Sequence, residues 1–219
     1  MLTNKFKINY SIGSVANGIK TDTFTFFLLF FYSNIIGLKP SLAGLAIFIA
    51  LCVDAITDPL MGTISDRTKS SLGRRHPYML ISFIPMSLGY VFLFAPRQDW
   101  DMSQNDLFVW MTIFTILTRI GMTLFDIPHR AFGGEVTKNY KERTLLMSWR
   151  EMVGWVAGLS NAFLGYGIFF ASTPEYPQGQ LNPDAWFPFA VTGAIFMIIS
   201  VLYSSLSTKD EIKSLSKWS

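Results

Sequence analysis

Six long stretches dominated by apolar residues limit most strongly what this chain can fold into. A helix needs about 20 mostly apolar residues to cross the hydrocarbon core of a bilayer. Charged residues make up only 15% of the 219-residue sequence, whereas soluble domains contain roughly 25%. We therefore expect an all-α membrane protein with one bundle over residues 1–207. Its six transmembrane helices are predicted at residues 10–36, 41–64, 77–96, 106–132, 145–171 and 184–206.

Basic residues alternate from one side of the predicted membrane to the other. Of the 18 Lys and Arg residues, most fall in segments on one side, whereas Lys39 and Arg97 fall on the opposite side. An excess of Lys and Arg marks the cytoplasmic side, so both termini are expected in the cytoplasm and the chain in a plasma or bacterial inner membrane. The net charge of +3 then reflects topology, and no nucleic-acid partner is expected. The residues on the basic side are Lys5, Lys7, Arg67, Lys69, Arg74, Arg75, Lys138, Lys141, Arg143, Lys209, Lys213 and Lys217.

Several ionisable residues lie inside the predicted spans. A charge at the centre of a bilayer costs about 3 kcal/mol on insertion scales, and such residues usually face the protein interior and have a functional role. We therefore expect these side chains to face inward, where they meet one another or water. They are Lys20, Asp22, Asp54, Asp58, Arg119, Asp126, Arg130 and Arg150.

The second span carries two aspartates four residues apart, Asp54 and Asp58. Residues at this spacing share one face of a helix, and paired carboxylates can share a proton or bind a small hard cation. Pro59 frees a backbone carbonyl one turn earlier, and Thr57 adds a hydroxyl. These oxygens predict a Na⁺ or H⁺ site. The alternative is that the aspartates reach cytoplasmic water at the helix end, since Asp66 follows Asp58 by eight residues.

The fourth span places Arg119, Thr123, Asp126 and Arg130 on one stripe, because they are spaced by four, three and four residues. One interpretation is a self-contained Asp126–Arg130 ion pair that stiffens the helix. The other is a solute-binding stripe. Arg150 in the next span favours binding, because it brings a second cation that needs a partner in the membrane.

The first span also contains polar residues. Asn17, Gly18 and Asp22 are spaced so that they can line one cavity. Lys20 lies two residues before Asp22 and points in a different direction, so it either extends to the membrane surface or pairs with a neighbouring helix. Asn17, Lys20 and Asp22 are therefore candidate solute-binding residues.

The sequence contains no signature of enzyme chemistry. It has no glycine-rich nucleotide loop and no H-E-x-x-H or C-x-x-C metal signature. The single Cys52 excludes an internal disulfide. We expect no catalytic residue, no cofactor and no metal beyond the coupling cation.

The stretch from Asp54 to Gly62, D-A-I-T-D-P-L-M-G, resembles the glycoside–pentoside–hexuronide:cation symporters, a branch of the major facilitator superfamily. The resemblance covers essentially the whole chain. It continues through S-D-R at 65–67, G-R-R-H-P at 73–77, D-I-P at 126–128 and E-R at 142–143 to Arg150.

The resemblance assigns roles to individual residues. It implies that Asp54, Asp58, Thr57 and Thr123 bind the coupling cation, Na⁺, Li⁺ or H⁺. It implies that Asp126 and Arg150 belong to the sugar site, with no covalent chemistry. It also implies a cytoplasmic gating loop made of Gly62, Asp66, Arg67, Gly73, Arg74 and Arg75.

Two positions depart from the melibiose permease branch of that family. Gly18 stands where this branch has an aspartate that binds the sugar, and Arg130 stands where it has a tryptophan. A galactoside is therefore not favoured. Arg130 and Arg150 together would suit an acidic sugar such as a uronate.

Transporters of this family have two six-helix halves around a central cavity, and the chain resembles only the N-terminal half. We expect residues 208–219 to begin the linker between halves, and a second half in the same or a separate chain to complete the transporter. Two other functions stay open. One is a lipid or lysolipid carrier that uses the paired arginines for a phosphate, and the other is a non-transporting membrane receptor or assembly subunit.

Overall fold

The computed structural model describes residues 2–209, so most of the predicted linker lies outside the described residues. Every regular element in the described part is helical. The N-terminal region consists of α1 (Asn4–Ile12), α2 (Ser14–Asp22), η1 (Thr23–Phe27), α3 (Leu28–Phe30) and η2 (Phe31–Ile36). The longer helices are α4 (Pro40–Arg67), α5 (His76–Ile81), α6 (Phe83–Leu93), α7 (Gln104–Glu135), α8 (Tyr140–Leu164) and α9 (Trp186–Ser207). Short helical turns are η3 (Gln98–Trp100), η4 (Gly165–Phe169), η5 (Gly179–Leu181) and η6 (Pro183–Ala185).

Five helical segments of the described chain are long and apolar enough to cross a membrane. They match the predicted second to sixth spans, and they are Pro40–Arg67, His76–Leu93, Gln104–Glu135, Tyr140–Phe169 and Pro183–Ser207. The first predicted span, 10–36, is divided among consecutive shorter pieces, two of which, η1 and η2, are π-helical. The count of six therefore stays a prediction. π-Helical turns in a helix often occur at functional sites.

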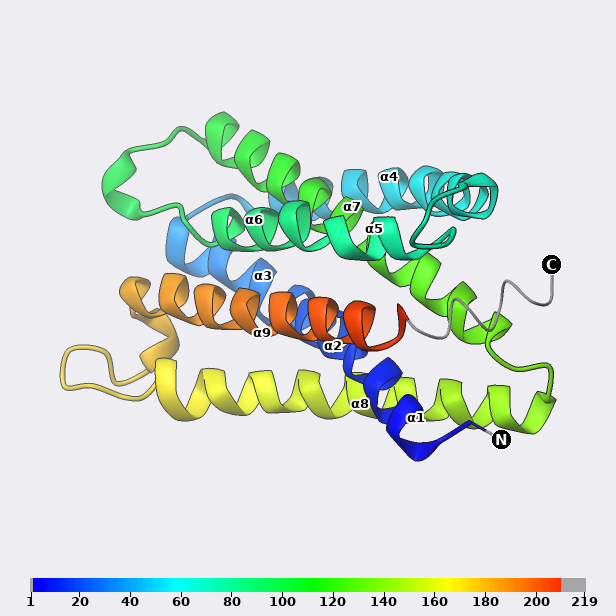
Figure 1. Ribbon diagram of the computed structural model, residues 1–219. Helices are drawn as coiled ribbons and strands as arrows, with labels where there is room; N and C mark the ends of the chain where they lie inside the picture. Colours follow the sequence, from blue (N-terminus) through cyan, green and yellow to red (C-terminus); the bar gives the residue numbers. More distant parts are fainter. Residues whose placement is uncertain (1, 210–219) are drawn as a thin grey trace.

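The helices form two groups that pack on each other (Figure 1). In one group α7 packs against both α4 and α6, and in the other α2 packs against both α8 and α9. Contacts between α6 and α9 join the groups. Buried aromatic rings fill the junction, where Trp186 stacks on Phe94 with 6.1 Å between ring centroids and lies 5.2 Å from Phe31.

The loops gather at the two ends of the bundle (Figure 1). At one end Arg97 bonds Asp184 across two loops at 3.3 Å. At the other end Lys7 of α1 lies 3.6 Å from Glu142 of α8. The predicted basic segments within the described residues lie at this second end, so the alternation of charge along the sequence corresponds to a real separation in space.

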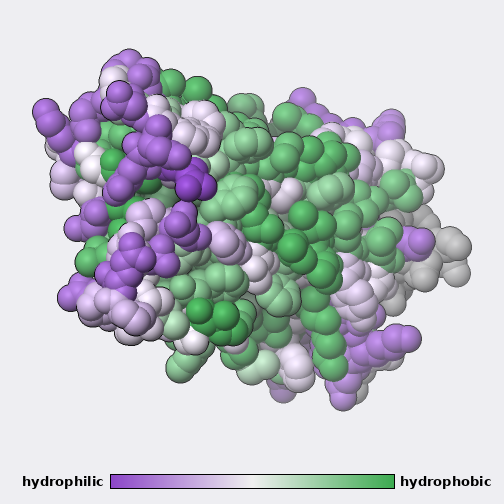
Figure 2. Space-filling view, turned by 90° about the vertical axis from the view of Figure 1, so that its left-hand side faces the viewer, coloured by the Kyte–Doolittle hydropathy of each residue, from purple (hydrophilic) through white to green (hydrophobic). Residues whose placement is uncertain are grey.

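A hydrophobic surface lies between hydrophilic areas at either side of the view in Figure 2. Burial differs among the five apolar helices. In the most apolar part of α4 only 17% of the residues are buried, and in that of Tyr140–Phe169 only 22% are, compared with 50% for Pro183–Ser207. α4 and α8 therefore have the largest unpacked faces among these five helices.

Candidate functional site

α4 and α7 run in the same direction and match turn for turn. Their first turns are held together by the Lys39 N–H, which donates to the side chain of Gln104 at 2.9 Å. Further along, Asp54 bonds Arg119, and Asp58 accepts a hydrogen bond from Thr123 Oγ1 at 2.7 Å. Both pairs have the same sequence separation of 65, because a step of four residues advances each helix by about one turn. The polar stripe of α7 therefore meets the aspartates of α4.

Both aspartates make their contacts with α7, so they lie at the interface of the two helices. The side chains of Arg119 and Asp54 are 14% and 21% exposed. Asp54 Oδ1 and Thr57 Oγ1 are buried without a hydrogen-bond partner among the described residues. Buried oxygens without a partner are rare in proteins, and oxygen ligands of this kind suit a small hard cation. The donor set fits the predicted coupling cation, although its binding stays a prediction.

A second charged group joins α7 to α8. Asp126 accepts a hydrogen bond from Arg150 and forms an ion pair with Arg130, whose Nε lies 2.7 Å from its Oδ2. Arg150 is only 1% exposed, and it also bonds Glu151 at 2.6 Å. Asp126 pairs with Arg130 within its own helix and with Arg150 across helices, so the ion pair within α7 is not self-contained, and solute binding at this stripe stays a prediction. Arg150 therefore links two carboxylates, while Arg130 stays half-exposed.

Lys20 lies on α2 and is half-buried. Within the described residues it makes no ion pair. Its role at the solute site stays a prediction.

Asp22 points toward α8. It is 7% exposed and accepts a hydrogen bond from Asn161 Nδ2 at 3.0 Å. Asn161 also bonds Thr23 Oγ1 at 3.3 Å, and Thr23 bonds Tyr90 at 2.6 Å. A chain of polar side chains therefore crosses the interior from α8 to α6.

A cavity of about 280 Å³ lies between α2 and α8. Asn17, Gly18 and Asp22 line it together, as their spacing predicts, and Glu151 and Trp155 form part of its other wall. The Trp155 ring is 71% exposed. The cavity thus offers amide, carboxylate and aromatic groups beside the Arg150 cluster.

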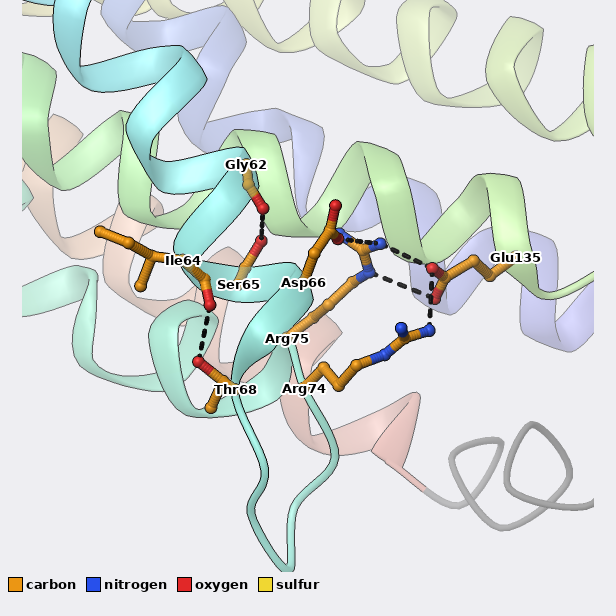
Figure 3. Close-up of polar contacts among 8 residues, drawn as sticks. All are labelled: Gly62, Ile64, Ser65, Asp66, Thr68, Arg74, Arg75 and Glu135. Atoms are coloured by element: carbon orange, nitrogen blue, oxygen red, sulfur yellow. Dashed lines mark hydrogen bonds and ion pairs between the residues drawn. The ribbon is translucent and has the colours of Figure 1, made fainter. Parts of the chain in front are cut away.

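The predicted gating residues form a cluster at the end of the bundle where α4 ends (Figure 3). Arg75 bonds Asp66 at 2.8 Å. It also donates two hydrogen bonds to Glu135, from Nε to Oε2 at 3.2 Å and from Nη2 to Oε1 at 2.6 Å. Arg74 reaches the same carboxylate at 3.2 Å. Two parallel hydrogen bonds from one guanidinium to one carboxylate form a strong, directional pair, so Glu135 ties the loop after α4 to the end of α7.

The other predicted gating residues have less direct parts. Gly73 has a φ of 76°, which favours glycine, and allows the tight turn before Arg74. The carbonyl of Gly62 accepts a hydrogen bond from Ser65 at 3.0 Å (Figure 3). Arg67 ends α4, is exposed and makes no ion pair in the part of the chain that the structure describes.

Glu135→Gln is expected to loosen this cluster, because it leaves the buried guanidinium of Arg75 with Asp66 as its only remaining anionic partner. We expect amide hydrogen exchange in the loop 68–75 to accelerate about tenfold, the equivalent of 1.4 kcal/mol. The measurement is hydrogen–deuterium exchange with mass spectrometry. Arg67→Gln is the control and should leave exchange unchanged. Equal acceleration in both variants would show that loss of any charge here, rather than this pairing, loosens the loop.

The sequence prediction missed three partners. Glu135 lies just beyond the predicted fourth span, and the need of Arg74 and Arg75 for a counter-charge was the signal. Asn161 is an amide in an apolar segment, which is itself a sign of a buried partner. Glu151 adjoins Arg150 and was not considered. Arg119 was placed on the polar stripe of the fourth span but not assigned to the cation site.

Comparison with known proteins gives consistent results. A family model described as MFS/sugar transport protein matches residues 9–217. The chain is 31% identical over 210 residues to an uncharacterized symporter of Synechocystis sp., which covers 94% of the chain and 38% of that protein. It is 23% identical to the isoprimeverose transporter of Lactiplantibacillus pentosus, over 95% of the chain and 42% of that protein. It is 29% identical to the sodium-dependent lysophosphatidylcholine symporter 1-A of Danio rerio, over 79% of the chain and 32% of that protein.

The chain spans about two fifths of the length of the first of these relatives. The match to the family model covers nearly all of the chain. Its all-helical structure, with five segments able to cross a membrane, agrees with half of a major facilitator fold. The chain therefore belongs to the MFS/sugar transport protein family, within the glycoside–pentoside–hexuronide:cation symporters, and is a multi-pass integral membrane protein.

Proposed function

We propose that this chain is the N-terminal half of a secondary active transporter that couples Na⁺ or H⁺ movement to uptake of a sugar-like solute. The observation that carries the proposal is the pair of α4 carboxylates. Asp54 and Asp58 face α7 inside an apolar bundle, and two buried oxygens on the same stretch of α4, Asp54 Oδ1 and Thr57 Oγ1, have no partner among the described residues.

The proposed cycle follows from the cost of charge in a low-dielectric interior. A cation binds Asp54 and Asp58 with the help of Thr57 and Thr123 and lowers the net negative charge of the inner region. The solute then binds near Asp126 and Arg150. The lower net charge that the bound cation gives the inner region lowers the barrier to closing the two halves of the complete transporter around the cavity and solute, which is the step expected in alternating access.

The contacts of the arginines favour an uncharged solute over the acidic sugar that the sequence alone suggested. Arg150 already bonds Asp126 and Glu151, and Arg130 already bonds Asp126. An anionic group would have to displace one of these carboxylates, whereas sugar hydroxyls can bond them where they stand. The exposed Trp155 ring in the adjacent cavity provides an apolar surface for a sugar ring. An acidic sugar is the second option.

A lipid or lysolipid carrier is the main rival, and the relative from Danio rerio is named for such a substrate. A phosphate headgroup is best bound by guanidinium groups that are free of other anions. Arg119, Arg130 and Arg150 all bond carboxylates here. This balance favours a sugar-like solute.

Uptake into proteoliposomes tests the proposal. The chain is reconstituted with a C-terminal six-helix half from a relative, and uptake of labelled pentosides, hexosides, a uronide and a lysolipid is measured with a Na⁺ gradient, a pH gradient or neither. We expect a sugar to accumulate under one of the gradients and Asp58→Asn to abolish this accumulation. Sugar uptake that ignores both gradients contradicts symport, and accumulation of the lysolipid alone supports the rival. No uptake of any solute favours a receptor or assembly subunit.

A further inference from the structure

The two acids of the proposed cation site have different partners. Asp54 forms an ion pair with Arg119, while Asp58 accepts only a neutral hydrogen bond from Thr123, at 2.7 Å. No Lys, Arg or His lies within ion-pair distance of Asp58 among the described residues. One of the two carboxylates is therefore neutralised by the protein itself, and the other is not.

Arg119 is held in this position from more than one side. Its guanidinium carbon lies 5.6 Å from the centroid of the Phe24 ring, a cation–π contact of ordinary length. Phe24 belongs to the π-helical turn η1 of the first helix, so Arg119 joins that turn to α4. Its Nε is buried and has no acceptor in the described part of the chain. The guanidinium thus bonds through Nη1 with no second carboxylate to compete for it.

The charges of Asp54, Asp58 and Arg119 do not cancel. The two aspartates together carry two negative charges, and Arg119 supplies one positive charge in direct contact with Asp54. The three side chains therefore have a net charge of −1. Lys20 makes no ion pair with either aspartate in the described part of the chain. Two oxygens, Asp54 Oδ1 and Thr57 Oγ1, stay without donors. The site therefore keeps one negative charge without a counter-charge in direct contact, and it has two oxygens that could bind a cation.

We propose that Arg119 acts as a tethered cation that sets the valence of the coupling site. It occupies one of the two charge positions at the acid pair, so that the site takes a single monovalent cation and disfavours a divalent one. This inference rests on the proposed function of Asp54 and Asp58 as the cation site. It adds a specificity-determining residue that binds no solute and no transported ion itself.

Four forms of the chain separate this role from a purely structural one. The 219-residue chain is placed in lipid nanodiscs, and binding of ²²Na⁺ is measured directly. The summed charge of the side chains at positions 54, 58 and 119 is −1 in the wild type and 0 in Asp54→Asn. It is −1 again in Asp54→Asn/Arg119→Gln and −2 in Arg119→Gln. We expect Asp54→Asn to lower Na⁺ affinity at least about tenfold, and the double variant to recover affinity to within about threefold of the wild type. Arg119→Gln should bind Na⁺ more tightly and acquire Ca²⁺ binding.

Arg119→Lys is the matched control, because it retains the charge and should keep wild-type affinity and no Ca²⁺ binding. If Arg119→Gln alone does not fold, the double variant still decides the question, since replacing both members of a buried ion pair by neutral groups is tolerated far better than replacing one. A double variant that binds Na⁺ no better than Asp54→Asn overturns the inference, as does Ca²⁺ binding by Arg119→Lys. Absence of Na⁺ binding in all forms, the wild type included, contradicts the Na⁺ site itself and the inference with it. Wild-type binding with the wrong order among the variants contradicts the inference alone.

Discussion

Replacing Arg150 by methionine is expected to destabilise the bundle by about 3–5 kcal/mol, because removing one partner of a buried ion pair leaves an uncompensated charge. The guanidinium is 1% exposed and bonds both Asp126 and Glu151. Methionine has a similar length but no donor, so Asp126 would keep only the exposed Arg130. The measurement is unfolding of the chain in detergent micelles with increasing SDS, followed by circular dichroism.

Arg130→Met is the matched control for this prediction. Arg130 bonds the same carboxylate at 2.7 Å, but its side chain is 52% exposed. Exposed ion pairs contribute at most about 1 kcal/mol, so the control should lose little stability. Adding Asp126→Asn to Arg150→Met should recover part of the loss, since the buried charge is then removed from both sides. Equal losses for Arg130→Met and Arg150→Met would mean that the cluster is hydrated in the same way throughout.

The positions of the helices could be predicted from the sequence because the cost of polar groups in a bilayer acts along the chain. Residues 41–64 and 106–132 were predicted as spans. α4 and α7 each extend three residues beyond the predicted C-terminal end, to Arg67 and Glu135. These added turns carry Asp66 and Glu135, whose charges placed them outside a span by hydropathy. The charged groups at this end of the bundle pair with one another, since Arg75 bonds both Asp66 and Glu135, and the helices continue far enough to bring them together.

The candidate site could be predicted only in part, because helical spacing gives the face of a residue but not its partner on another helix. The spacing of Asp54 and Asp58 placed both on one face, and the structure places that face against α7. Their different partners depend on the register between α4 and α7, which no local pattern specifies. Asp22 shows the same limit, since it was assigned to the solute and its contact in the structure is Asn161.

The first helix shows why the departure at Gly18 matters for the fold as well as for the solute. A Cβ atom on Gly18 would lie 2.0 Å from the carbonyl oxygen of Gly154 and 3.1 Å from the backbone nitrogen of Gly158. Small residues spaced four apart let two membrane helices approach closely, and Gly154 and Gly158 form such a pair on α8. α2 and α8 therefore pack backbone to backbone at this point.

Gly18→Ala is expected to destabilise the bundle by about 2–3 kcal/mol, because the neighbouring atoms are backbone and the helices must separate to admit even one methyl group. The same unfolding measurement applies. Gly44→Ala in α4 is the control, since a Cβ there meets nothing within 4 Å. This control should be neutral or stabilising by up to about 1 kcal/mol through helix propensity. Equal effects of the two substitutions would show that α2 and α8 are not in close contact.

Gly18→Asp is expected to disturb the packing of α2 on α8 in the same way, and this limits its effect on solute binding. This change restores the acid that the melibiose permease branch has at this position, and on sequence grounds alone it should create galactoside binding. The structure predicts instead that the carboxylate is directed at the backbone of α8, so that the bundle loses stability and galactoside binding measured on the reconstituted transporter stays absent. Galactoside binding by Gly18→Asp at wild-type stability would show that the two helices can separate at little cost.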